Sequence, residues 1–258
     1  MNKVAGYIKR KSMLYKTGVE YGDYTMNHIQ GCAHRCQYPC YAYLMARRFG
    51  KIRTIDDWGR PYLVENTIEL LHKELLSLHN KIKSVHLCFT TDPFMFGYPE
   101  IAGMSIKAIK TINKFGLPCS ILTKGCLPIS LASLSCDNSY GITLITLNEE
   151  FRKKVEPGAA PIRRRISALQ NLATVGCKTW VSIEPYPTPN IINQDLGELL
   201  ETVAFTKKII FGRANYNSKI SRYPGCKQFF NEQAQIVIDF CIKKGIDYHI
   251  KNGTVTMI

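Results

Sequence analysis

Short apolar segments alternate with amphipathic segments along most of this chain, and that alternation limits the fold more than any other feature. Strands buried on both faces of a parallel sheet read as short, nearly continuous apolar runs. Six such runs occur, at residues 24–30, 84–91, 118–123, 141–147, 179–185 and 208–212. Strands that alternate with helices in this way predict an α/β fold, here a partial (β/α)6 barrel of the TIM type.

The segments between these runs carry apolar residues at helical spacing. We predict helices at residues 65–79, 105–115, 161–175, 195–205 and 228–244. In the second of these, Ser105 is placed to cap the helix and Gly116 to end it. Residues 128–134 form one or two turns only, and residues 246–250 are expected to add a final strand.

An incomplete barrel leaves a wide lateral opening, and its functional residues gather at the C-terminal ends of the strands. An open, doubly wound sheet is the alternative fold. That fold carries a glycine-rich phosphate-binding turn after its first strand, and this sequence has no such turn. The loop after the first predicted strand holds a group of cysteines instead.

The chain contains no repeat and no low-complexity linker, so we predict one domain over residues 1–258. In this interpretation the barrel core covers about residues 20–215, and residues 216–258 supply a C-terminal helix and the final strand. A chain of 258 residues that is 45% hydrophobic can bury a full core.

The formal net charge of +14 attracts polyanions, which makes nucleic acid a candidate partner. The basic residues are scattered along the chain, so charge alone does not decide for it. No apolar run is long enough to span a bilayer, and the N-terminus has no apolar signal-peptide region. These features predict a cytoplasmic protein with free thiols and no membrane partner.

Cys32, Cys36 and Cys40 lie close together in the pattern C-x3-C-x3-C. Three thiolates are one short of the four that close a zinc or iron–sulfur site. A cluster held by three thiolates keeps one iron open for a ligand, which favours catalysis. The alternative is a non-catalytic, basic protein that binds nucleic acid and holds a structural zinc, with His34 or a distant cysteine as fourth ligand. Structural zinc sites usually use paired C-x2-C knuckles, and the other cysteines are isolated.

This motif and the segments around it resemble the radical S-adenosylmethionine (radical SAM) superfamily, and within it the spore photoproduct lyase-like branch. Residues 24–27 are similar to that branch's strand into the cluster loop, and Cys40-Tyr41-Ala42 to its exit into the first helix. The later strand ends are similar in the same order, with Thr90-Thr91-Asp92-Pro93, Leu122-Thr123-Lys124, Ile145-Thr146-Leu147-Asn148, Glu156-Pro157-Gly158 followed by Arg165, and Ser182-Ile183-Glu184-Pro185.

The cysteine motif departs from the family pattern in its spacing. The usual spacing is C-x3-C-x2-C, so this chain has one extra residue before Cys40, either Tyr38 or Pro39. Tyr38 would correspond to the aromatic residue that normally precedes the third cysteine. Because proline removes an N–H and fixes φ, we expect a changed hydrogen-bonding pattern near the sulfurs.

The resemblance implies that Cys32, Cys36 and Cys40 bind three irons of a [4Fe–4S] cluster and that the fourth iron binds SAM. A one-electron donor of the flavodoxin or ferredoxin type would then drive cleavage of SAM to a 5′-deoxyadenosyl radical, which abstracts hydrogen from an unknown substrate. Lys124 or Arg165 would face the SAM carboxylate. The full set of residues implied to bind the cofactor is Tyr38, Thr90, Thr91, Asp92, Lys124, Thr146, Arg165, Ser182 and Glu184.

Three further cysteines are candidates for a hydrogen donor. The lyase uses a cysteine near the end of the second strand, and Cys88 lies in that strand. Cys88 lies one residue further from Asp92 than the lyase's cysteine lies from the corresponding aspartate. In a strand, a shift of one residue turns the side chain to the opposite face. Cys126 and Cys226 lie in predicted loops after the third and sixth strands. A cluster-containing protein that senses redox state without catalysis is a third hypothesis.

Overall fold

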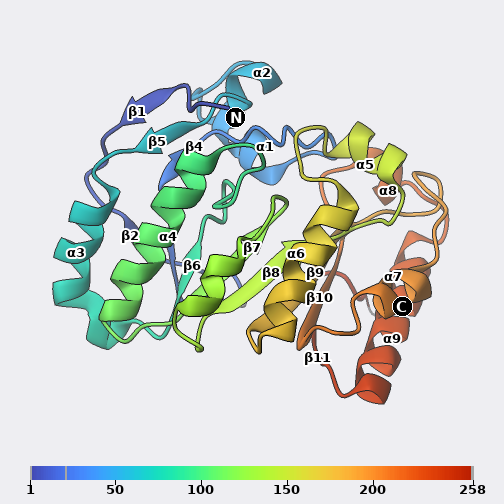
Figure 1. The fold of residues 1–258 in the computed structure, drawn as a ribbon. Helices are drawn as coiled ribbons and strands as arrows, with labels where there is room; N and C mark the ends of the chain where they lie inside the picture. The colour runs from blue at the N-terminus through green and yellow to red at the C-terminus, as the bar shows by residue number, and fades with distance from the viewer. Residues whose placement is uncertain (1, 21, 257–258) are drawn as a thin grey trace.

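The computed structural model describes residues 2–20 and 22–256, which form an α/β fold around a mostly parallel sheet (Figure 1). Among the described residues the main sheet has eight strands, in the order β11-β10-β9-β8-β7-β6-β3-β2. Their bounds are β2 (Leu14–Lys16), β3 (Tyr24–Met26), β6 (Val85–Leu87), β7 (Cys119–Thr123), β8 (Ser139–Thr143), β9 (Lys178–Tyr186), β10 (Lys208–Arg213) and β11 (Asp247–Ile250).

From β3 to β11 the strands lie side by side in chain order, and every neighbouring pair in this series is parallel. This order is the winding of a TIM-type barrel. It confirms the predicted α/β class and the final strand β11, and each of the six predicted segments contains a strand of this sheet. The predicted strand at 24–30 was too long, because its last two residues belong to a different sheet. The cysteine loop follows β3, the first strand of the parallel series, as the sequence predicted.

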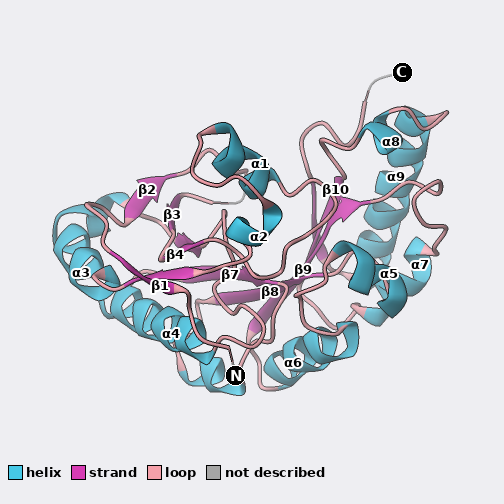
Figure 2. Ribbon diagram, turned by 90° about the horizontal axis from the view of Figure 1, so that it is seen from above, coloured by secondary structure: helices cyan, strands magenta, loops and turns pink. Residues whose placement is uncertain are grey.

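Helices cover the outside of the sheet. The helices are α1 (Tyr41–Arg48), α2 (Ile55–Trp58), α3 (Thr67–Leu78), α4 (Pro99–Lys114), α5 (Glu149–Val155), α6 (Ile162–Thr174), α7 (Leu196–Thr202), α8 (Ser218–Ser221) and α9 (Cys226–Lys244), with 3-10 turns at His79–Lys81 and Ile129–Ser133. In Figure 2, α3, α4, α6 and α9 lie around the strands. In Figure 1, α1, α2 and α5 gather at one end of the sheet.

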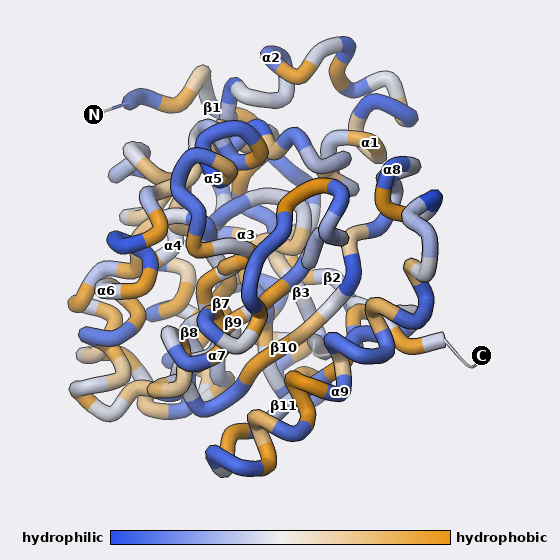
Figure 3. The backbone as a smooth tube through the Cα atoms, turned by 90° about the vertical axis from the view of Figure 1, so that its right-hand side faces the viewer, coloured by the Kyte–Doolittle hydropathy of each residue, from blue (hydrophilic) through white to orange (hydrophobic). Residues whose placement is uncertain are grey.

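One continuous hydrophobic core joins these layers. Helix α4 contributes Ala108, Ile109 and Ile112, and α6 contributes Leu169 and Leu172, all with no exposed surface. Figure 3 shows hydrophobic residues along β9 and β10 in the middle of the molecule. Burial of these apolar faces stabilises the helices on the sheet. No described helix has both the length and the apolar character needed to cross a membrane.

Helix α4 begins at Pro99, so the predicted start at Ser105 was wrong. Proline at the first turn suits a helix start because its missing N–H has no intrahelical partner there. Ser105 lies fully buried inside α4, and its hydroxyl contacts Pro93 O and His28 Nε2. It therefore fastens α4 to the loop after β6 and does not cap the helix.

The sequence analysis also missed helix α5 and a second, three-stranded sheet. That sheet has the order β1-β5-β4, with β1 (Gly6–Ile8), β5 (Tyr62–Val64) and β4 (Ile29–Gln30). Strands of two or three residues are too short to show an alternation of apolar and polar positions. The second sheet lies above the end of the main sheet that carries the cysteine loop (Figure 1).

A contact bridges the two edges of the main sheet. Glu20, in the loop between β2 and β3, accepts a hydrogen bond from the backbone N–H of Asn252 at 3.2 Å. The other carboxylate oxygen of Glu20 lies 2.6 Å from Nε2 of His249 on β11. The loop between β2 and β3 therefore contacts the last strand and the segment after it, across the lateral opening that six barrel units would leave.

Gly141 provides a test of packing inside the sheet. It pairs with Trp180 on the neighbouring strand, and a Cβ at Gly141 would lie 2.4 Å from the indole ring. Gly141→Ala should lower the free energy of unfolding by about 1–3 kcal/mol because the buried ring must move. Gly103→Ala, in helix α4 with open space around it, should raise it by about 0.5–1 kcal/mol. Urea unfolding measures both changes, and equal changes would contradict this account.

Candidate cofactor site

The C-terminal ends of the parallel strands surround a cavity of about 430 Å³, which is within the usual size of small-molecule and cofactor pockets. Its walls come from the cysteine loop and from the segments that follow β6, β7, β9, β10 and β11. The structure brings the following predicted site residues together around this cavity: Cys32, Cys36, Tyr38, Cys40, Thr90, Thr91, Asp92, Lys124, Ser182 and Glu184.

Two residues of the predicted cofactor set lie outside the lining of this cavity. Thr146 is buried, and its hydroxyl accepts a hydrogen bond from the backbone N–H of Asn148 at the start of α5. Arg165 is 1% exposed and directs its guanidinium to Glu156 and to backbone carbonyls. Both side chains are thus engaged within the protein.

None of the three hydrogen-donor candidates lines the cavity. Cys88 is 4% exposed, and its sulfur lies 3.4 Å from Nδ1 of His28 in a buried cluster. Burial raises the pKa of Cys88 to about 12. Cys126 is half-buried, and Cys226 begins α9 and packs against the core. Cys88 follows the end of β6 at Leu87 and has a positive φ of 65°, so the strand alternation used to predict its orientation does not apply to it.

The three motif cysteines come from one loop and face one cavity. Cys32 donates its N–H to Trp58 O at 2.7 Å, and Cys40 is the N-cap residue of α1. A helix N-terminus stabilises a nearby thiolate. Burial raises the pKa of Cys36 to about 12 and that of Cys32 well above its usual value. Such thiols become thiolates when a metal centre stabilises them.

The donor set fits an iron–sulfur cluster held by three thiolates, in which Cys32, Cys36 and Cys40 would each hold one iron. Within the described ranges, no three histidine, cysteine, aspartate or glutamate side chains converge on a point that could hold one metal ion.

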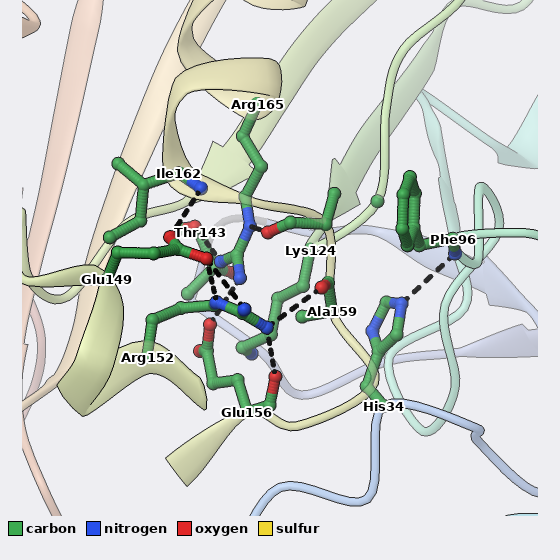
Figure 4. Close-up of polar contacts among 12 residues, drawn as sticks. His34, Phe96, Lys124, Thr143, Glu149, Arg152, Glu156, Ala159, Ile162 and Arg165 are labelled. Atoms are coloured by element: carbon green, nitrogen blue, oxygen red, sulfur yellow. Dashed lines mark hydrogen bonds and ion pairs between the residues drawn. The ribbon is translucent and has the colours of Figure 1, made fainter. Parts of the chain in front are cut away.

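A buried ion pair lies beside the cysteine loop (Figure 4). Arg165 Nη2 is 2.6 Å from Glu156 Oε2, and both side chains are 1% exposed. Arg165 also donates to Ala160 O at 2.8 Å and to Thr143 O at 3.0 Å. Burial alone would raise the pKa of Glu156, but Arg165, Lys124 and a hydrogen bond from Tyr38 together hold that pKa below its usual value. Glu156 is therefore a buried carboxylate.

This carboxylate holds the cysteine loop in place. The hydroxyl of Tyr38 donates to Glu156 Oε1 at 2.5 Å. The backbone N–H of Gln37 donates to Val155 O, and that of Gly158 donates to His34 O. A Cβ at Gly158 would lie 1.9 Å from Ala33 O, so only glycine allows this approach. The loop is thus fastened to the turn between α5 and α6 at several points.

Arg152 supports the same turn from the other side. Its guanidinium donates to the carbonyl oxygens of Glu156 and Ala159 and to the carboxylate of Glu149 (Figure 4). Glu149 in turn accepts the backbone N–H of Ile162 at the start of α6. The sequence analysis did not identify Arg152 or Glu149, because charged residues on a short helix usually face solvent.

Asp92 ties the second and third strand ends to the cysteine loop. Its carboxylate accepts hydrogen bonds from the Thr123 hydroxyl at 2.6 Å, from Lys124 N–H at 2.7 Å and from Phe94 N–H at 2.9 Å. Its Oδ2 also lies 3.4 Å from Nδ1 of His34. Asp92 therefore fixes the direction in which Lys124 leaves the third strand.

His34, which the sequence analysis considered only as a fourth ligand of a zinc site, also lines the cofactor cavity. Phe96 donates its N–H to His34 Nε2 at 3.2 Å (Figure 4), which places the ring proton on Nδ1, facing Asp92. Burial lowers the pKa of His34 to about 4 although Asp92 lies nearby, so the ring is neutral at pH 7. The position of His34 between two motif cysteines was the only signal in the sequence.

Lys124 is the cation at the inner wall of the cavity. Its Nζ lies 5.7 Å from the centre of the Tyr38 ring, a cation–π distance. Burial alone would lower the pKa of Lys124, but the charges at Cys36, Glu156 and Cys40 outweigh it and the pKa is raised. The opposite wall carries Glu184, whose carboxylate lies 3.7 Å from Lys251 Nζ, and whose pKa is raised chiefly by burial.

The sequence model of the Radical SAM superfamily matches residues 26–203, from the end of β3 to α7, which is more than half of the chain. The chain belongs to the radical SAM superfamily. The members of this superfamily depend on a [4Fe–4S] cluster, on SAM and on an electron donor.

Two relatives are uncharacterized proteins. One, from Acidianus two-tailed virus, is 29% identical over 195 residues, which is 72% of this chain and 64% of the length of the viral protein. The other, from Methanocaldococcus jannaschii, is 26% identical over 235 residues, which is 89% of this chain and 85% of the archaeal protein.

Solved structures share the fold. Spore photoproduct lyase complexed with dinucleoside spore photoproduct aligns with a TM-score of 0.64 at 14% identity, over 95% of this chain and 82% of the lyase. SuiB of Streptococcus suis bound to S-adenosylmethionine aligns with a TM-score of 0.53 at 14% identity, over 72% of this chain and 43% of SuiB. The predicted resemblance to the lyase branch is therefore confirmed as a likeness of fold.

Removal of the Glu156 charge should destabilise the protein. Glu156→Gln leaves Arg165 buried without its counter-charge and should lower the free energy of unfolding by about 3–5 kcal/mol. Glu150→Gln is the matched control, because Glu150 is 77% exposed and pairs with Lys153 at the surface of α5; it should cost less than about 1 kcal/mol. Urea unfolding measures both variants. Equal costs would show that the buried pair does not have this structural role.

Proposed function

We propose that this protein is a radical SAM enzyme in which Cys32, Cys36 and Cys40 hold a [4Fe–4S] cluster and the adjoining cavity binds SAM. One observation carries the proposal: the three thiols of one loop open onto a cavity at the C-terminal ends of the parallel strands. When bound, the cluster and SAM supply a 5′-deoxyadenosyl radical that abstracts hydrogen from a substrate. The residues of this chain bind, orient and shield that chemistry.

Lys124 is the residue that we assign to the SAM carboxylate. Arg165, the other cation that the sequence offered, is committed to Glu156 and does not line the cavity. Lys124 does line it, and its raised pKa keeps it charged. In this assignment Arg165 is a positioning residue, because it fixes Glu156, which in turn fixes Tyr38 beside Lys124.

Some of the remaining polar side chains of the cavity already form hydrogen bonds within the protein, and the others are available to SAM. Thr90 donates its hydroxyl to Asn27, and Asp92 accepts three hydrogen bonds from its own neighbours. We assign Asp92 to positioning the cavity wall and Thr91 to the SAM ammonium. Ser182 and Glu184, at the end of β9, are the acceptors that we assign to the ribose hydroxyls.

Deoxyadenosine formation tests the proposed function. The protein is reconstituted anaerobically with iron and sulfide, mixed with SAM and dithionite, and assayed for 5′-deoxyadenosine. The wild type should form it, and Cys36→Ala should not, because the cluster loses one of three ligands. Cys136→Ala, an exposed cysteine outside the site, is the control and should behave as the wild type. Bound zinc with no cluster would overturn the proposal.

The assignment of Lys124 predicts a loss of SAM affinity in Lys124→Met. Because a hydrogen bond to a charged group contributes about 1.5–3 kcal/mol, the Kd for SAM should rise about ten- to a hundredfold. Anaerobic titration calorimetry on the reconstituted protein measures this change. Lys153→Met, at an exposed position of α5, should leave the Kd unchanged. An unchanged Kd in Lys124→Met, at full iron content, would contradict the assignment.

A further inference from the structure

A second and larger cavity, of about 620 Å³, lies behind one wall of the cofactor cavity. Ala42, Trp58, Thr90 and Thr91 line both cavities, so these four residues lie between them. The same wall adjoins the cysteines, because Gly31 and Ala42 flank the motif and Trp58 O accepts the N–H of Cys32. This second cavity is thus the back of the cysteine loop.

The second cavity is basic. Its lining includes four cations, Arg10, Lys51, Arg53 and Arg60, and one carboxylate, Asp57. Asp57 accepts the backbone N–H groups of Arg53 and Thr54 at the start of α2, and its pKa is lowered by these bonds. Its carboxylate therefore caps the N-terminus of α2, and its single negative charge offsets only part of the positive charge of the four cations.

Three of the cations around this cavity form no ion pair within the described part of the chain, although Arg60 lies near enough to Asp57 to contribute to its lowered pKa. These three cations are Lys51, Arg53 and Arg60, and all of them are exposed. The last turn of α1 adds two exposed arginines at positions 47 and 48. Phe49, next to them, lines the cavity and is 67% exposed. A basic surface that includes an exposed aromatic residue fits an acidic protein partner.

We propose that an acidic one-electron carrier protein docks on this surface, which we call the α1–α2 face and define by Arg47, Arg48, Phe49, Lys51, Arg53 and Arg60. The inference rests on the proposed function. One electron leaves the reduced carrier and enters the cluster held by Cys32, Cys36 and Cys40. The carrier is oxidised by one electron and the cluster is reduced by one, with no bond formed or broken.

Position favours a reductant over other anionic partners. Substrate and SAM occupy the cofactor cavity, so a protein donor must approach the cysteines from another side. The α1–α2 face offers that side, because Ala42 and Trp58 line both its cavity and the cofactor cavity. A nucleic acid or a membrane would gain nothing from lying behind the cysteine loop. Charge complementarity would then act mainly on the association rate.

A charge reversal separates docking from chemistry. In Lys51→Glu/Arg53→Glu, the reconstituted protein is mixed with photoreduced flavodoxin, and bleaching of the cluster absorbance is followed in time. The rate should fall at least about tenfold, and the wild-type rate should fall with added salt. The bleaching rate with dithionite, which needs no docking, should stay unchanged. Lys227→Glu/Lys243→Glu, at exposed positions of α9, carries the same charge change and should resemble the wild type.

A binding measurement accompanies the kinetic one. Titration calorimetry of the cluster-free protein with oxidised flavodoxin should give a Kd that rises at least about tenfold in the α1–α2 variant. Equal rates in both double variants would overturn the docking proposal. The docking proposal would also be overturned if dithionite reduced the wild-type protein but neither flavodoxin nor an acidic ferredoxin did. The proposal would also be overturned if the α1–α2 variant lost binding to single-stranded DNA or to anionic vesicles but kept its binding to flavodoxin. A wild type without a reducible cluster would contradict the proposed function instead.

Discussion

The ion pair between Glu156 and Arg165 is the interaction on which the geometry of the cofactor site depends. Both side chains are 1% exposed, and a single charge at that depth would be costly. The pair joins Glu156, at the end of α5, to Arg165 inside α6, and the carboxylate also accepts a hydrogen bond from the hydroxyl of Tyr38. Since Tyr38 lies between two motif cysteines, the charges that join these helices also fix the loop that carries the thiols.

This arrangement explains how the chain accommodates one more residue in its cysteine motif. Tyr38 is anchored by Glu156. The next residue, Pro39, has no backbone N–H and therefore needs no hydrogen-bond acceptor in the loop. The loop is then closed by Cys40 as the N-cap of α1. The extra residue is therefore absorbed between two fixed points. The loop has one face toward the cofactor cavity and another toward the basic α1–α2 face.

Much of the fold could be predicted because the signals are local. The parallel strands β6 to β10 are apolar on both faces, and helices α3, α6 and α9 show apolar residues at helical spacing, as buried elements must. The start of α4 was missed because Ser105 has the chemistry of a cap, whereas its burial against His28 and Pro93 depends on contacts distant in sequence. The short strands of the second sheet carry no readable period.

The candidate site divides in the same way. The sequence by itself determined the cysteine motif, the order of the strands, and the polar residues at the strand ends, because topology places the ends of parallel strands together. Only the tertiary structure decided which of two cations faces the cavity. Arg165 and Lys124 have the same charge, but Arg165 has a buried carboxylate within 2.6 Å and Lys124 lines the cavity. The physical reason is that a side chain's role depends on its neighbours in space, and the neighbours of Arg165 are set by how α5 and α6 pack.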